Sequence, residues 1–302
     1  MRLARRRTLA AAAAALVALA ATACSGPRPE PAPSSASAPV AGTTGTPTPA
    51  ARPVRPVRSI AALGDSLSRG FDACSHYGDC TSASWVTGTN PTVRSLATRF
   101  AAEQDGKRPV VHDDARSGAA VADLDRQVTL AIGQRPDLVT VLIGANDVCR
   151  PTLDDMTSAA DYAAAVAAAV QRLSAALPET TILVASVPDV PNLLQVAADD
   201  PTARFLWHAV GGCETVLANP RSTALPDLAR REAVRERLDA YDRALASACR
   251  RTERCVWDGG ALHAYQPTLG QLSALDLFHP SVAGLRELAA TEWRVLQASR
   301  RG

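Results

Sequence analysis

The sequence predicts an α/β domain in which helices cover both faces of a parallel sheet, and three observations lead to this prediction. First, short apolar runs bounded by Gly or Pro recur along the chain, such as Leu138–Ile143 and Thr181–Val187. Second, segments with apolar residues three or four positions apart lie between these runs. Third, strands that alternate with helices favour βαβ units, whose parallel strands are buried on both faces.

Short runs rich in apolar residues are predicted to be strands because a strand covered on both faces needs no polar alternation. The runs end at Gly, Pro or a polar residue, which stops the strand. In chain order the five predicted strands are Ser59–Leu63, Arg108–Asp113, Leu138–Ile143, Thr181–Val187 and Cys255–Trp257.

Four segments have the spacing of a helix with one apolar face. They are 121–132, 162–177, 234–248 and 282–296, and Pro178 ends the second of them. A long insertion, Asn192–Pro226, follows the fourth strand and carries apolar residues that include Phe205 and Trp207. Two interpretations of it stay open. It is a lid or acyl pocket over the site, or it is a core helix held by Cys213.

Three polar or small residues follow the first three predicted strands. Ser66 follows the first strand, Gly118 the second and Asn146 the third. The carboxyl ends of parallel strands meet at one edge of the sheet, where ligands bind in such folds. The sequence therefore predicts that Ser66, Gly118 and Asn146 lie around one site.

A serine nucleophile needs a base with a pKa near the working pH, and His is the usual choice. His279 is the best candidate because Asp276 precedes it by three residues. In a tight loop this carboxylate can hold Nδ1–H, which leaves Nε2 to face Ser66. The other histidines lack this motif and are predicted to be structural or surface residues: His76, His112, His208 and His263.

Acyl transfer also needs hydrogen-bond donors for the oxyanion. The candidates are the N–H groups of Ser66 and Gly118 and the side-chain amide of Asn146. A simple turn at Gly118, and a turn or N-cap at Asn146, are the alternatives. Asp147 is expected to orient its loop or cap a helix. The G-x-S-x-G elbow of α/β-hydrolases is absent, because Ser68 stands where its second Gly would be.

The N-terminal region predicts export. Basic residues at positions 2–7 precede an Ala/Leu-rich run that is too short for a membrane span, so residues 1–23 are predicted to be a cleaved signal. Cys24 stands where a lipoprotein signal places its acylated cysteine, although Ala21 replaces the usual Leu. An ordinary cleavage site is the alternative, and the Arg6-Arg7 pair leaves the twin-arginine route open.

Residues 24–58 are predicted to be a linker. Nine of the residues from 25 to 58 are Pro, and most others are Ala, Ser, Thr or Gly. Such a segment cannot bury enough apolar surface to fold, and its Pro content favours an extended spacer. The remaining residues, 59–302, are enough for one domain with a large core.

Six cysteines follow Cys24, and an even number in an exported chain predicts disulfides. Six cysteines allow fifteen pairings, so the sequence does not choose rigorously. Cys74/Cys80 and Cys249/Cys255 share one short spacing and close small loops, which leaves Cys149 to pair with Cys213. No C-x-x-C pair occurs, which argues against zinc.

From Ser59 onward there are 24 basic and 29 acidic residues, a net charge of −5. This balance argues against nucleic acid as a partner. We expect a monomer that acts on a small-molecule or lipid ester, anchored to a membrane only if Cys24 is acylated.

In these motifs the chain resembles the SGNH (GDSL) hydrolase family, from about Ser59 to Trp293. The name-giving residues correspond to Ser66, Gly118, Asn146 and His279, and Asp276 completes the triad. The segments SWVTG at 84–88 and GANDVC at 144–149 resemble the phospholipase B-like branch. One departure is that the segment before Gly118 begins with Asp114, where many members have Asn.

The resemblance implies a three-layer α/β/α sandwich with a five-stranded parallel, flavodoxin-like sheet. It also implies hydrolysis of carboxylic esters without a metal or organic cofactor. We therefore expect a secreted or outer-surface esterase or lipase. An alternative is an O-acetyl esterase for polysaccharide or cell-wall glycan, which the few Trp and Tyr residues disfavour. A non-catalytic surface binding protein on a hydrolase fold is the third possibility.

Overall fold

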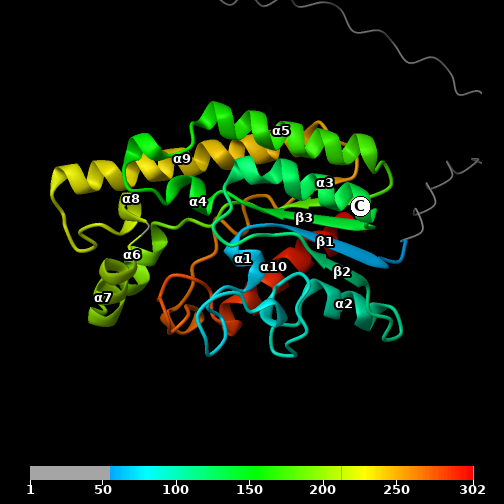
Figure 1. The fold of residues 1–302 in the computed structure, drawn as a ribbon, viewed down its shortest axis with the longest axis horizontal. Helices are drawn as coiled ribbons and strands as arrows, with labels where there is room; N and C mark the ends of the chain where they lie inside the picture. Colours follow the sequence, from blue (N-terminus) through cyan, green and yellow to red (C-terminus); the bar gives the residue numbers. More distant parts are fainter. Residues whose placement is uncertain (1–54, 212, 302) are drawn as a thin grey trace, which may run out of the picture. The chain divides into compact units, whose positions relative to one another are not determined.

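A computed structural model describes residues 55–211 and 213–301 of the chain. The predicted signal at 1–23, Cys24 and the linker up to residue 54 lie outside the described residues. The domain contains a five-stranded parallel sheet with helices on both faces, which confirms the predicted fold class (Figure 1). The strand order is β2-β1-β3-β4-β5, the arrangement called flavodoxin-like.

The five strands lie where the apolar runs predict them. They are β1 (Ser59–Gly64), β2 (Val110–Asp113), β3 (Leu138–Leu142), β4 (Thr181–Val184) and β5 (Cys255–Trp257). Ile60 pairs with both Val111 and Leu138, which places β1 between β2 and β3. All five residues of β3 are buried, as expected of a strand covered on both faces.

One predicted strand was three residues too long at its carboxyl end. The sequence predicts a strand over Thr181–Val187, but β4 ends at Val184. Beyond it the backbone N–H groups turn to side chains: Ser186 N–H donates to Asp258 Oδ2 and Val187 N–H donates to Asp242 Oδ1, both at 2.9 Å. An apolar run cannot reveal this change of partner, because Val187 stays fully buried.

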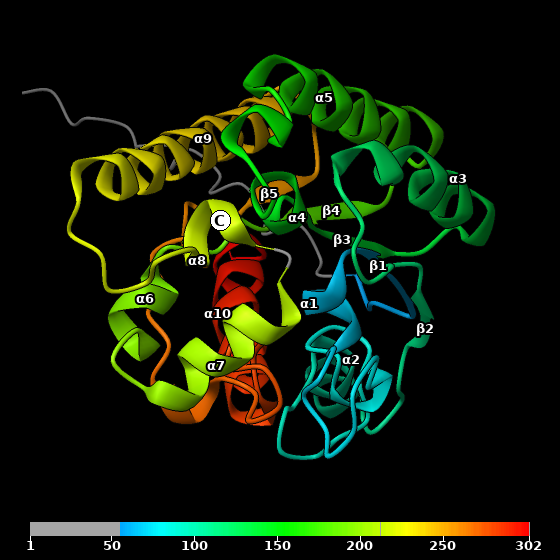
Figure 2. The ribbon, with the colours of Figure 1, turned by 60° about the vertical axis from the view of Figure 1, so that its left-hand side comes forward.

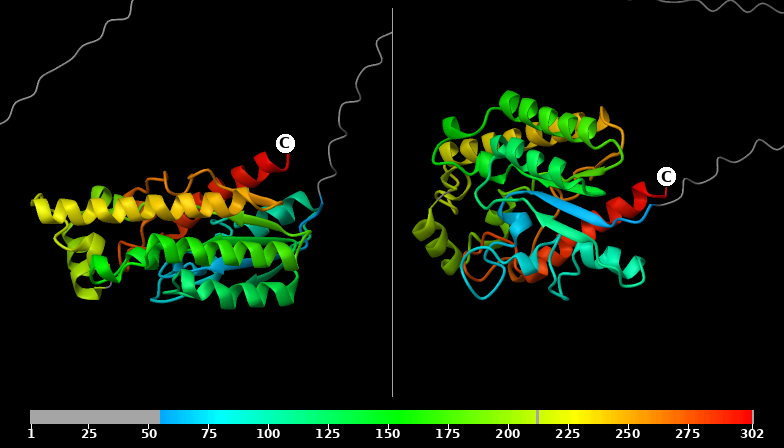
Figure 3. Two further views of the ribbon diagram at one scale, coloured as in Figure 1. Left: turned by 90° about the horizontal axis from the view of Figure 1, so that it is seen from above. Right: turned by 45° about the vertical axis from the view of Figure 1, so that its right-hand side comes forward.

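Helices α3 (Leu124–Gln134), α5 (Ala159–Ala176) and α9 (Leu225–Arg250) cover one face of the sheet (Figures 1 and 3). Their apolar stripes pack on side chains such as Leu63 and Val141 in one buried cluster. Tyr162 of α5 and Tyr241 of α9 stack with ring centroids 3.8 Å apart. The three helical patterns predicted for these segments are confirmed.

Helices α2 (Leu96–Glu103) and α10 (Val282–Ser299) cover the opposite face. The spacing predicts α10 but not α2, which is only eight residues long. Ser95 caps α2 by accepting a hydrogen bond from Thr98 N–H at 3.2 Å. The remaining short elements are α1 (Ser66–Arg69), α4 (Ala145–Val148) and the 3₁₀ turns Thr81–Ala83, Val121–Asp123, Leu153–Asp155 and Leu269–Gln271.

The insertion after β4 forms three short helices, so its interpretation as one core helix was wrong. These are α6 (Asn192–Ala197), α7 (Pro201–Val210) and α8 (Glu214–Leu217), and Pro226 already belongs to the first turn of α9. They gather beyond the carboxyl ends of the strands (Figures 1 and 2). Their inner face is packed, since Ala203 and Trp207 are buried, whereas Phe205 is 69% exposed.

Three disulfides tie elements together. Cys74 is bonded to Cys80 within one loop, Cys149 at the end of α4 to Cys213 before α8, and Cys249 of α9 to Cys255 of β5. The structure therefore holds the three pairs that the spacing favours. Within residues 55–211 and 213–301, the helices are too short or too polar to cross a membrane.

Candidate active site

The sharp turn after β1 presents Ser66. Gly64 has φ of +145°, and a Cβ there would lie 2.2 Å from the Leu142 carbonyl oxygen, so only glycine allows β1 to approach β3 this closely. Asp65 then caps α1 by accepting a hydrogen bond from Leu67 N–H at 2.9 Å. Ser66 is the first residue of this helix. Among the described residues, none accepts a hydrogen bond from its N–H.

The loop before α10 brings His279 and Asp276 to Ser66. His279 Nε2 lies 2.9 Å from Ser66 Oγ, and His279 Nδ1 lies 2.5 Å from Asp276 Oδ2. Asp276 Oδ1 accepts the N–H groups of Phe278 and His279. The tight loop needs Leu277 at φ of +50°, a strained conformation for a branched residue. The geometry therefore connects hydroxyl, imidazole and carboxylate in one relay.

The Asp276 carboxylate is ionised despite its burial. Burial alone would raise its pKa, but the hydrogen bond and charge of His279 and the two N–H groups of the loop outweigh it. The pKa of Asp276 therefore lies below its ordinary value. An ionised carboxylate on Nδ1–H holds the tautomer in which Nε2 can accept a proton.

Gly118 and Asn146 lie at the same edge of the sheet. Arg116 N–H donates to Gly64 O, which joins the loop after β2 to the end of β1. Asn146 Nδ2 donates to Ala119 O at 3.0 Å, which joins the loop after β3 to the same segment. This bond uses one of the two amide hydrogens. Gly118 has φ of +78° and open space where a Cβ would stand.

Two further residues hold this frame, and sequence reasoning did not assign them these roles. Gln127 of α3 donates to Gly64 O and accepts from Gly64 N–H, at 2.9 and 2.7 Å. Asp147 is fully buried and accepts from Val121 N–H at 2.9 Å and from the Thr157 hydroxyl at 2.6 Å. Asp147 thus orients its loop, as its position suggested.

Asp65, beside the serine, is a buried carboxyl group with an altered pKa. Burial raises its pKa to about 7, although the bond from Leu67 N–H and the nearby His279 oppose the change. Its second oxygen is buried and, within the described part of the chain, has no hydrogen-bond partner. The charge next to Ser66 therefore changes near neutral pH.

The structure corrects one interpretation of a histidine. We expected His263 to lack a carboxylate partner, but its Nδ1 lies 3.1 Å from Asp242 Oδ2 and 2.9 Å from the Val187 carbonyl oxygen. These partners are distant in sequence. The nearest serine, Ser186, is fully buried and donates to Asp258 at 2.6 Å. This second group of serine, histidine and acids is therefore structural.

Two clusters in the described residues have the side-chain types of metal ligands. One is Cys74, His76 and Cys80, but its cysteines are joined in a disulfide and offer no thiolate. The other is Asp72 with Asp276 and His279, where the histidine already bonds Asp276 and Ser66.

A groove of about 650 Å³ lies between α6 and the start of α9. Leu194, Leu225, Leu228 and Arg235 are among its lining residues. Ser66, His279, Gly118 and Asn146 do not line it. The groove is therefore separate from the candidate active site.

The fold and this edge of the sheet define an α/β protein of the hydrolase class. A family model of the GDSL-like lipase/acylhydrolase family matches residues 62–286, which is most of the described domain. The chain belongs to this family, and it is thus a hydrolase of the GDSL or SGNH type that acts on esters. A search of curated proteins found no match.

Solved structures show the same fold. An α/β hydrolase, LAE5, from the metagenome of Lake Arreo has a TM-score of 0.51 at 19% identity, covering 79% of this chain and 94% of that one. A family 3 carbohydrate esterase from Clostridium thermocellum scores 0.48 at 13% identity, covering 80% and 96%. Phospholipase A1 from Streptomyces albidoflavus scores 0.46 at 17% identity, covering 80% and 99%.

Proposed function

We propose that this chain is an exported serine hydrolase that cleaves carboxylic esters through an acyl-enzyme intermediate. One observation carries the proposal, the relay in which Nε2 of His279 lies 2.9 Å from Ser66 Oγ while Nδ1 lies 2.5 Å from Asp276. These distances are those of working hydrogen bonds, so the serine has a base and the base has an orienting carboxylate.

In the proposed reaction, Ser66 Oγ attacks the ester carbonyl carbon as its proton passes to Nε2 of His279. The imidazolium is stabilised by Asp276 and returns the proton to the leaving alcohol oxygen. Water then attacks the acyl-enzyme, with His279 again taking the proton, and releases the acid and Ser66.

Three donors are proposed to bind the oxyanion in both steps. They are the N–H groups of Ser66 and Gly118 and the remaining amide hydrogen of Asn146. Both N–H groups are free of described acceptors, and a donor that is already oriented loses no free energy in reorganisation. The space beside Gly118 leaves room for substrate to approach its backbone.

Export is part of the proposal. The three disulfides support an oxidising compartment. The signal at 1–23, acylation of Cys24 and the spacer role of 24–58 stay predictions. The substrate is proposed to be a lipid or small acyl ester.

The test is turnover of p-nitrophenyl esters of increasing acyl length by the mature protein. We expect hydrolysis, with an organophosphate modifying Ser66 and Ser66→Ala removing nearly all turnover while the far-UV spectrum stays unchanged. Activity on long chains would place the substrate among lipids, and activity on acetyl esters alone would favour a glycan esterase. No turnover, or modification of another serine, would refute the proposal.

A further inference from the structure

The loop closed by the Cys74–Cys80 disulfide folds back on its own first residue, Asp72. Asp72 N–H donates to Gly78 O at 2.9 Å, and Gly78 N–H donates to Asp72 Oδ1 at 2.6 Å. Asp72 is 4% exposed and has φ of +55°, which few residues other than Gly, Asn and Asp adopt. The structure thus holds a strained, buried acid at a defined place.

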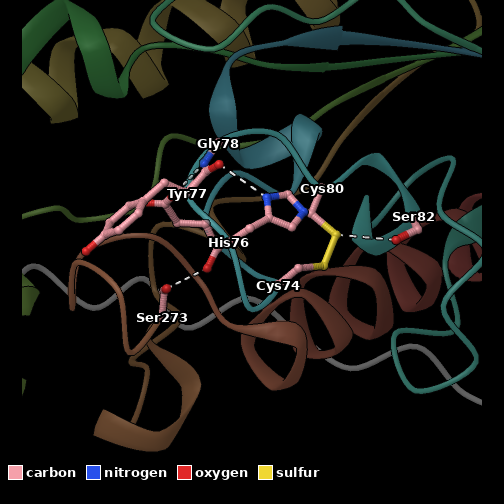
Figure 4. Close-up of a disulfide and its surroundings, with 8 residues drawn as sticks. Cys74, His76, Tyr77, Gly78, Cys80, Ser82 and Ser273 are labelled. Carbon is pink, nitrogen blue, oxygen red and sulfur yellow. Dashed lines mark hydrogen bonds between the residues drawn. A yellow bond between two sulfur atoms is a disulfide. The ribbon is translucent and has the colours of Figure 1, made fainter.

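Ser273 joins this loop to the loop of His279. The Ser273 hydroxyl donates to Asp72 O at 2.5 Å, beside the disulfide (Figure 4). Ser273 N–H donates to His279 O at 2.7 Å. One residue therefore bonds both the disulfide loop and the histidine of the relay.

The side chain of Asp72 also reaches the relay. One carboxylate oxygen of Asp72, one of Asp276 and one ring nitrogen of His279 lie within 4.8 Å of one another. Two buried carboxylates this close repel each other when both are ionised, so one of them keeps its proton. The N–H and imidazole donors around Asp276 favour its ionised form.

The other charged groups near Asp72 are engaged elsewhere. Arg69 of α1 pairs with Asp79 and Asp113. Asp79 also accepts a hydrogen bond from Ser117, and the exposed His76 contacts the Tyr77 carbonyl oxygen. Within the described chain, no ion pair reaches Asp72.

The pKa values separate in the same sense. Burial raises the pKa of Asp72, the hydrogen bond from Gly78 opposes this, and the charge of Asp276 raises it further. The pKa of Asp276 is lowered. Each acid thus favours the protonation state that its hydrogen bonds indicate.

We propose that Asp72 is a positioning residue of the relay, whose protonated carboxyl group donates a hydrogen bond to ionised Asp276. The inference rests on the proposed function and deepens it. Asp276 then has fixed donors from its own loop, from His279 and from the disulfide loop, so its carboxylate cannot rotate away from Nδ1. The same loop holds the segment before Gly118 through Asp79 and Ser117.

The experiment compares Asp72→Asn, Asp72→Ala and a matched control, Asp105→Ala. Asn has the shape of a protonated Asp, donates to Asp276 and tolerates positive φ. Asp105 also has positive φ, at +50°, but it is exposed on the loop after α2. Asp105→Ala therefore carries the same backbone cost without the contact with the relay.

We expect Asp72→Ala to lower kcat about tenfold or more at nearly constant KM, because a loosened Asp276 misplaces the base. Asp72→Asn should keep most of kcat and leave the acid limb of the pH–rate profile at its wild-type position. An acid limb shifted to lower pH in Asp72→Asn would mean that wild-type Asp72 is ionised, which overturns the proposal. Equal kcat in Asp72→Ala and Asp105→Ala would overturn it as well.

A second measurement does not depend on turnover. The proton between His279 Nδ1 and Asp276 gives a low-field resonance in the ¹H NMR spectrum of histidine-labelled protein. We expect this signal in the wild type and in Asp72→Asn, and its shift or loss in folded Asp72→Ala. An unchanged signal in Asp72→Ala would refute the positioning role. If the wild type hydrolyses no ester, the proposed function fails, and this signal still decides the role of Asp72.

Discussion

At the residue scale, the candidate site consists of side chains that short sequence motifs place and of backbone groups that distant residues hold. Ser66 and His279 are 213 positions apart and yet within hydrogen-bonding distance. Each lies on a turn that its own neighbours fix, Asp65 for the serine and Asp276 for the histidine. This explains why the motifs are readable in the sequence, since each turn is specified locally.

The residues that sequence reasoning missed have distant partners. Gln127 bonds a glycine 63 positions away, and Asp72 receives the hydroxyl of Ser273, 201 positions away. A lone Gln on a helix or an Asp in a cysteine loop carries no local signal of such contacts. In this chain the sequence predicts the reacting groups better than the groups that orient them.

Removing the Asp276 carboxylate is expected to change both rate and pH dependence. The rate should rise with pH in the wild type, as the imidazolium of His279 loses its proton and becomes a base. In Asp276→Ala the imidazolium loses the charge that stabilises it, so the acid limb moves to lower pH, and kcat falls because the ring is no longer oriented. The measurement is the pH–rate profile of both proteins. An unchanged limb would mean that another carboxylate orients the base.

Asn146→Ala tests the oxyanion donor. The variant keeps the relay of Ser66 and His279, and it loses one amide donor toward the substrate and one toward Ala119 O. We expect kcat to fall about 100- to 1,000-fold, with labelling of Ser66 by an organophosphate retained. Asn192→Ala, on α6, is the control for loss of an amide outside the site. A normal kcat in Asn146→Ala would remove this residue from the proposed oxyanion hole.

At the element scale, the sheet was predictable because its strands are continuous apolar runs ended by Gly or Pro. The errors arise where tertiary contacts decide. The run after Val184 stays apolar but leaves the sheet for Asp258 and Asp242. The insertion is apolar enough for one helix, but it breaks at Ala198 and at Gly211.

The Cys149–Cys213 disulfide joins the loop of Asn146 to this insertion. It does not act alone, because the Thr215 hydroxyl donates to Val148 O and accepts from Arg150 N–H. We expect the double variant Cys149→Ser/Cys213→Ser to lose about 4 kcal/mol of unfolding free energy at most. Its kcat should fall severalfold, since the oxyanion loop loses one of its supports.

The matched control is Cys249→Ser/Cys255→Ser, which removes the disulfide between α9 and β5. Its smaller loop predicts a loss of about 2 kcal/mol and no change in kcat. Peptide mapping of the unreduced protein comes first, and free thiols or other pairings would refute the pairings. Equal kcat in the two double variants would refute the coupling of Cys149 to the site.

At the scale of the whole molecule, buried carboxyl groups make stability depend on pH in an unusual direction. Burial raises the pKa of Asp65 and Asp242 to about 7 and that of Asp113 to about 6. Their unfolded forms ionise near the ordinary value of 3.8. The folded chain therefore binds more protons between these values, and stability falls as pH rises through this window. Asp276, with its lowered pKa, acts in the opposite sense at lower pH.

Glu292 of α10 offers the cleanest test because it is remote in sequence from the site loops and fully buried. Burial, and then the nearby Asp258, raise its pKa well above the ordinary 4.5. Its stabilising contribution is thus complete below about pH 4.5 and declines as pH rises toward the folded pKa. Glu292→Gln keeps a neutral donor beside Asp258 and removes this decline. We expect the fall in Tm between pH 5 and pH 8 to be smaller in Glu292→Gln than in the wild type. Glu287→Gln, on the same helix and partly exposed, should keep the wild-type slope. Parallel curves for Glu292→Gln and the wild type would mean that Glu292 is already ionised in the folded protein.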